Sequence, residues 1–190
     1  MMWKRALIVP TAIKRFATSR SGAGAVEFAI VFPILLVIYI CSFELTIGLS
    51  ISKRVARAGA AVADIVTQQQ AVSPTWLQDM PYVAKSILVP YSSTGMALKI
   101  TAVQTDNTGK GSVTWSWAQD NSRPYSVQSN VNLPSELQTP NSFYIRTEFL
   151  LPYSLTFTPT FLPGALRTIT IKRTYYYRQR QGDAIGCSLC

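Results

Sequence analysis

The side chain with the clearest chemical potential is Glu27, because it stands where a basic leader meets a long apolar segment. A carboxylate at the edge of a bilayer costs free energy unless it is paired or hydrated. The residues before it, 21–25, are small, which leaves the chain open to a protease and lets a neighbouring helix pack closely. Two roles stay open for Glu27: pairing with a cation, or marking the headgroup boundary at the positive end of a helix dipole.

Two cysteines, Cys187 and Cys190, close the sequence as CSLC. A structural disulfide is expected if this end lies in the periplasm, where disulfides persist. Free thiols and redox chemistry stay open, although a thioredoxin-like motif normally lies near a βαβ unit. A metal site is disfavoured because no histidine and no second Cys-x-x-Cys pair can complete four ligands.

The composition argues against an enzyme. The 190 residues include no histidine, which removes Ser-His-Asp triads, Cys-His pairs and imidazole acid–base catalysis. No nucleophile–base pair is visible, so we expect no catalytic residues, no metal and no cofactor. The net charge is +9, but much of the excess lies in the basic leader, so we expect no nucleic-acid partner. The basic stretch over 167–180 is interpreted as a solvated strand face or a surface near lipid headgroups.

The segment from Phe28 to Ile51 is apolar and long enough to span a membrane, since about 20 residues cross a hydrocarbon core of about 30 Å. A buried core helix of this length would need a larger protein around it, and a signal peptide would have a shorter apolar region. The leader is basic and has no acid, which predicts a single-pass protein with a cytoplasmic N-terminus and a C-terminal domain outside the inner membrane. Glu44 falls near the outer boundary and need not be buried.

The membrane helix is expected to continue to about residue 70, with Ala56, Ala60 and Ala63 along one small face. Gly59 is the residue that argues against continuity, since glycine disfavours helix interiors. A second helix is predicted to start at Ser73-Pro74, where serine can cap the helix and proline can occupy its first position.

Four later segments alternate apolar and polar residues with period 2, as strands with one buried face do. One face of each is formed, in chain order, by Leu98, Ile100 and Ala102; by Val113, Trp115 and Trp117; by Phe143, Ile145, Thr147 and Phe149; and by Ile169, Ile171, Arg173, Tyr175 and Tyr177. Segment 119–142 is rich in Ser, Asn and Pro and predicts a long surface loop. We therefore expect an α+β fold, in which a small antiparallel sheet packs on the helices. The predicted parts are a leader over 1–22, a long helix over 23–70 and an extracytoplasmic α+β domain over 71–190.

The residues around Glu27 resemble the processing site of Flp/Tad-type prepilins, which is a glycine, four residues, then glutamate and an aromatic residue. Gly22 supplies the glycine, and Glu27 and Phe28 complete the motif. The resemblance implies that a prepilin peptidase cleaves between Gly22 and Ala23 on the cytoplasmic side. The carboxylate of Glu27 would then neutralise the new α-amine of a neighbouring subunit and set the axial register of a pilus.

The wider pattern is similar to TadE/TadG-like minor pilins (pseudopilins) of tight-adherence secretion systems. Residues 24–29 (GAVEFA) followed by Pro33 carry the resemblance in the membrane helix, and residues 113–116 (VTWS) resemble the family's strand motif. It implies a pilin-like fold and a minor pilin of a Flp-type pilus for adherence and secretion. The protein would then lie in the inner membrane of a bacterium, with its C-terminal domain in the periplasm. Its partners would be a prepilin peptidase, other pilins, the Tad assembly platform and the inner membrane. The alternatives are an uncleaved single-pass adaptor that recruits assembly partners, and a membrane-tethered enzyme.

Overall fold

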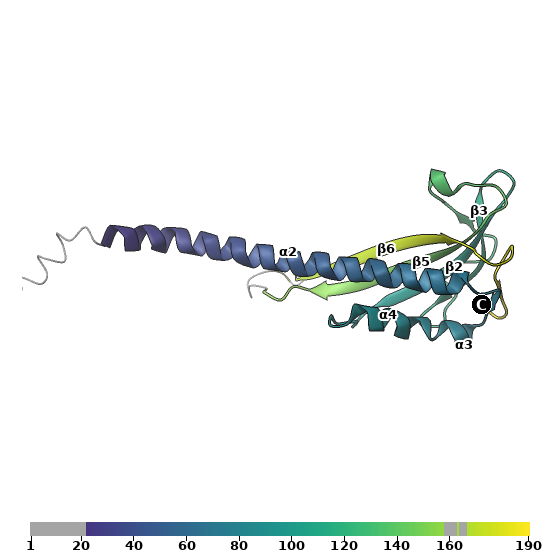
Figure 1. The fold of residues 1–190 in the computed structure, drawn as a ribbon, viewed down its shortest axis with the longest axis horizontal. Coiled ribbons are helices and arrows are strands. Elements are labelled where there is room, and N and C mark those ends of the chain that lie inside the picture. Colours follow the sequence, from purple (N-terminus) through teal and green to yellow (C-terminus); the bar gives the residue numbers. More distant parts are fainter. Residues whose placement is uncertain (1–21, 158–162, 164–166) are drawn as a thin grey trace, which may run out of the picture. The chain divides into compact units, whose positions relative to one another are not determined.

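The computed structural model describes residues 22–157, Pro163 and 167–190 (Figure 1). The chain divides into two compact units between Phe43 and Glu44. Helix α2 (Ala23–Thr67) contains this division and includes both Pro33 and Gly59. The predicted long N-terminal helix is therefore confirmed, and it ends at Thr67.

The first half of α2 has the surface of a membrane-spanning helix. In the part of the chain that the structure describes, α2 is the one helix that is long and apolar enough to cross a membrane. The most apolar 18-residue window has a mean hydropathy of 2.4, and none of it is buried. Large apolar side chains from Val26 to Tyr39 are 45–68% exposed. A helix that is apolar all round requires an apolar environment, so this half of α2 places the protein in a membrane.

The second unit is built on an antiparallel sheet in the strand order β4-β3-β2-β5-β6. These strands are β2 (Ala97–Thr105), β3 (Gly111–Ala118), β4 (Asn130–Val131), β5 (Phe143–Ser154) and β6 (Thr168–Arg178). Three short helices are α3 (Pro74–Leu77), α4 (Met80–Leu88) and the 3-10 turn η2 (Ser135–Leu137), and a separate parallel pair is formed by β1 (Ala71–Val72) and β7 (Gly186–Cys187). The predicted α+β class is confirmed.

Local signals placed the second helix correctly. The Oγ of Ser73 accepts a hydrogen bond from the backbone N–H of Trp76 at 3.2 Å, and Pro74 is the first residue of α3. Proline lacks the backbone donor that a helix interior needs. A new helix, α4, accordingly begins at Met80, so that Pro81 lies in its first turn.

The main core lies between the second half of α2, the short helices and one face of the sheet (Figure 1). The face of α2 that enters this core contains Ile51, Val55, Ala58, Val62 and Val66, all at most 2% exposed. On the predicted small face, Ala63 is buried and Ala56 and Ala60 are half-buried. The larger branched side chains fill the core because they bury more apolar area than alanine.

Gly59 is required where α2 crosses the sheet. A Cβ at this position would lie 2.8 Å from the ring of Tyr175 on β6, which is closer than van der Waals contact allows. The Oγ1 of Thr147 on β5 also donates a hydrogen bond to the carbonyl of Gly59 at 3.1 Å. Close approach of helix and sheet thus offsets the cost of a glycine inside a helix.

A β-bulge overturns the predicted face of β3. Ala102 pairs with Trp115, but the next residue, Val103, pairs with Val113, so Thr114 has no partner on β2. The extra residue shifts the alternation of side chains, because successive residues of a strand point to opposite faces. Trp115 and Trp117 therefore lie in the main core, as expected, whereas Val113 lies in a second cluster on the other face.

The prediction of a surface loop over 119–142 is wrong in part. It contains β4, in which Val131 pairs with Gly111 and Asn130 pairs with Ser112 of β3. Val131 and Leu133 are 9% and 7% exposed and join the second cluster. Two apolar residues in a polar segment are enough to fold it back over the sheet, because burying each stabilises the domain by about 1.5–3 kcal/mol.

Candidate functional site

The predicted processing motif lies at the start of α2. Gly22 is exposed and directly precedes the first helical residue, Ala23. A Cβ added at Gly22 or at Gly24 would meet no atom within 4 Å. The fold of the chain itself therefore gives no steric reason for glycine at either position.

Glu27 is exposed one turn into α2, and Phe28 beside it is 61% exposed. The ring of Phe28 contacts that of Phe32, with the ring centroids 5.3 Å apart. The carboxylate of Glu27 has no hydrogen-bond or ion-pair partner among the residues that the structure describes. An ionised group at a membrane boundary is stabilised by a cation or by water, so the cation that Glu27 could pair with has to come from elsewhere.

Glu44, the other acid of α2, is held by the C-terminal domain. Its Oε2 accepts a hydrogen bond from the hydroxyl of Tyr153 at 2.8 Å, and its Oε1 accepts one from the backbone N–H of Phe157 at 2.6 Å. These contacts join the end of β5 to α2. Sequence analysis did not find them, and no local pattern signals a pair of residues more than 100 positions apart.

The cysteine-containing end is attached to the domain at several points. β7 pairs in parallel with β1, and the carbonyl of Ile185 accepts a hydrogen bond from the indole N–H of Trp115 at 2.7 Å. The Cα atoms of Cys187 and Cys190 are 5.6 Å apart, which lies in the range that disulfides span. This position is compatible with the disulfide, which remains a prediction.

We expect reduction to lower the free energy of unfolding by no more than about 2 kcal/mol, because the bond between Cys187 and Cys190 would close a loop of only four residues. Urea unfolding with and without dithiothreitol measures the difference. The double variant Cys187→Ser/Cys190→Ser is the control and should not respond to the reductant. Three reactive thiols in the untreated protein, one of them Cys41, with no effect of dithiothreitol, would show that Cys187 and Cys190 are free.

A polar cluster on the other face of the sheet ties segment 119–142 to β5. The ring of Tyr125 lies between Lys99 and Arg146, at 5.7 Å and 5.1 Å from its centroid, and its hydroxyl donates to Glu148 at 2.7 Å. Arg146 and Glu148 form an ion pair at 2.5 Å. Burial and then the hydrogen bond to Glu148 raise the pKa of Tyr125 above 10.0, so this tyrosine stays neutral at pH 7. The cluster is therefore structural.

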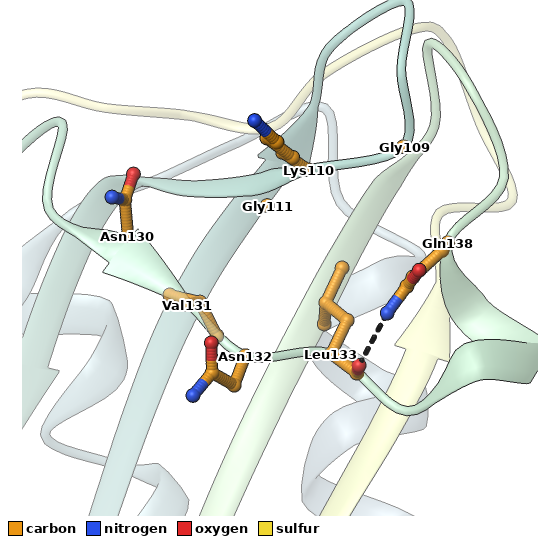
Figure 2. A pocket seen from close by; sticks show the side chains of 8 residues that line it. All are labelled: Gly109, Lys110, Gly111, Asn130, Val131, Asn132, Leu133 and Gln138. Carbon is orange, nitrogen blue, oxygen red and sulfur yellow. Dashed lines mark hydrogen bonds between the residues drawn. The ribbon is translucent and has the colours of Figure 1, made fainter.

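A polar pocket of about 500 Å³ lies between the β2–β3 turn, β4 and Gln138 (Figure 2). The Nε2 of Gln138 donates to the carbonyl of Leu133 at 3.0 Å across one side of it. Gly109 has φ +85°, and a Cβ there would lie 2.3 Å from the carbonyl oxygen of Gln138. Lys110 is the one ionisable side chain in the lining, which also contains two asparagines, so the pocket has no acid–base pair. The described residues also contain no group of three or more His, Cys, Asp or Glu that could hold a metal ion.

Comparison with known proteins identifies the N-terminal part of the chain. Residues 22–64 match the family model of TadE-like proteins. The match begins at Gly22 and ends within α2, so it includes Glu27 and the whole apolar segment. The resemblance predicted from the sequence is thus confirmed over this range, and it supports association with a Tad pilus. No curated protein and no solved structure matches the chain.

Proposed function

We propose that this chain, which matches the TadE-like family over residues 22–64, is a minor pilin (pseudopilin) of a Tad pilus. In this proposal a prepilin peptidase cleaves between Gly22 and Ala23, and the processed subunit joins other pilins and the Tad assembly platform through α2. The N-terminus lies in the cytoplasm and the α+β domain over 71–190 lies in the periplasm, as the basic leader favours.

The observation that carries the proposal is the carboxylate of Glu27, four residues beyond Ala23, which has no partner among the described residues. Cleavage after Gly22 creates a cationic amine at Ala23. A neighbouring subunit in the same helical array can bring its amine to Glu27, and a mismatched register leaves both charges without a partner in a low-dielectric environment. The charge pair would therefore select one axial register. Gly22 fits the same account, because its lack of a side chain has no role in the fold.

The N-terminus of the mature protein tests this proposal. We expect membranes from cells with a matching prepilin peptidase to contain a chain that starts at Ala23, and the variant Gly22→Val to remain uncut. Gly24→Val is the matched control, because Gly24 also has open space around it and should be processed normally. Mass spectrometry of the N-terminal peptide distinguishes these products. An intact leader on the wild-type protein would contradict the proposal and favour the uncleaved inner-membrane adaptor.

A further inference from the structure

The end of the C-terminal domain beside Glu44 exposes large apolar side chains from three elements. On α2, Leu45 and Leu49 are 64% and 55% exposed. Phe157, which follows β5, is 53% exposed, and Ile169 on β6 is 51% exposed. Ile169 pairs with Tyr153, whose hydroxyl is bonded to Glu44, so these side chains belong to one end of the domain.

Two contacts show that β5 and β6 follow α2 away from this end. Tyr153 is bonded to Glu44, and Arg173 donates a hydrogen bond to the Oγ of Ser52 at 2.8 Å. Arg173 is paired with Phe149 on β5. Eight residues of helix span about 12 Å, and four residues of strand span about 13 Å. The helix α2 and the β5–β6 hairpin therefore run side by side. Residues of the three elements that lie at the same distance from Glu44 along α2 form one level.

The next level, farther from Glu44 in the direction of Ser52, is basic. Lys53, Lys172 and Arg173 are exposed there, and Arg54 lies 5.5 Å from the centroid of the Tyr91 ring. Tyr91 and Tyr153 line the same surface hollow, between the apolar and the basic levels. An apolar layer, then tyrosines, then cations is the order in which proteins cross from lipid tails to headgroups.

We infer that this end of the domain is a second membrane contact, in which Phe157 and Ile169 enter the outer leaflet beside α2. The occupant of the apolar surface is phospholipid. This surface is continuous with the membrane-spanning surface of α2, because the apolar segment of α2 extends to Ile51, beyond the level at which Tyr153 and Phe157 contact Glu44. The two donors to Glu44 give its carboxylate the partners that it needs near lipid. The inference depends on the membrane location of α2 and not on cleavage at Gly22.

Site-specific photocrosslinking in lipid tests this contact. The full chain carries p-benzoylphenylalanine at position 157 and is reconstituted in vesicles of phosphatidylcholine and phosphatidylglycerol. We expect lipid adducts at position 157 to be several-fold more abundant than at position 127, where Val127 is 60% exposed in the loop after β3. Position 35 is the positive control, because Leu35 is 53% exposed on the apolar part of α2.

Adducts at 35 and at 157, but not at 127, support the contact. Adducts at 35 alone would overturn it and leave the membrane span intact. A crosslink from position 157 to a second copy of the chain, without lipid adducts, would also overturn it and identify that surface as a protein interface. Because the leader is retained in this experiment, its outcome does not depend on the peptidase.

Discussion

Replacing Glu27 by glutamine is expected to leave cleavage after Gly22 intact and to prevent incorporation of the subunit into a pilus. The amide has the same length as the carboxylate but cannot neutralise the amine of Ala23 in a neighbouring subunit. Removing one partner of a buried ion pair costs about 3–5 kcal/mol, which corresponds to a loss of roughly two to four orders of magnitude in the assembly equilibrium. The structure describes no partner within the chain that could substitute for that cation.

The fraction of the protein in sheared pili, relative to the membrane pool, measures this effect, and mass spectrometry verifies that Ala23 is the N-terminus. Glu44→Gln is the matched control, because it makes the same change at the other glutamate of α2. The amide oxygen of a glutamine can still accept the hydrogen bond from Tyr153, so we expect incorporation to persist. Normal incorporation of Glu27→Gln would refute the register role of Glu27.

The parts of the fold that were predictable depend on neighbours in the chain. The apolar run of α2, the cap at Ser73 and the period-2 pattern of the strands each arise from residues a few positions apart. The predicted processing motif also depends on neighbours, because its glycine and glutamate lie on one short segment within the range that matches the TadE-like family, while cleavage there remains a prediction. These features required no knowledge of tertiary packing.

The features that were not predictable depend on residues that only the fold brings together. From the sequence, Gly59 argued against a continuous helix. In the fold it leaves room for the ring of Tyr175, which lies on a strand more than 100 residues later. The unpaired Thr114 shifts Val113 to the second cluster, and a single extra residue in a strand leaves no clear periodic signal. The hydrogen-bond donors to Glu44 were not predictable either, because Tyr153 at the end of β5 meets Glu44 only in the folded chain. Long-range contacts of this kind decide where α2 meets the sheet.

Truncation of Phe149 to alanine is expected to destabilise the C-terminal domain strongly and to leave the membrane segment helical. Phe149 is 1% exposed at the centre of β5 and faces α2 beside Gly59. Removal of a buried phenylalanine side chain costs about 3–5 kcal/mol, because the glycine opposite it has no side chain to fill the cavity. This loss is a large share of the roughly 5–15 kcal/mol that stabilises an ordinary domain.

Urea unfolding in detergent, followed by the fluorescence of the buried Trp115 and Trp117, measures this loss. Phe157→Ala is the matched control, because Phe157 is 53% exposed and keeps the backbone N–H that binds Glu44, so we expect a change within about 0.5 kcal/mol. Circular dichroism of Phe149→Ala should retain the helical signal of the segment before Glu44, since the chain divides into two units there. Loss of that signal together with the domain would show that the membrane segment depends on the core between α2 and the sheet. Equal losses from Phe149→Ala and Phe157→Ala would instead place the stabilising contacts at the end of the hairpin beside Glu44.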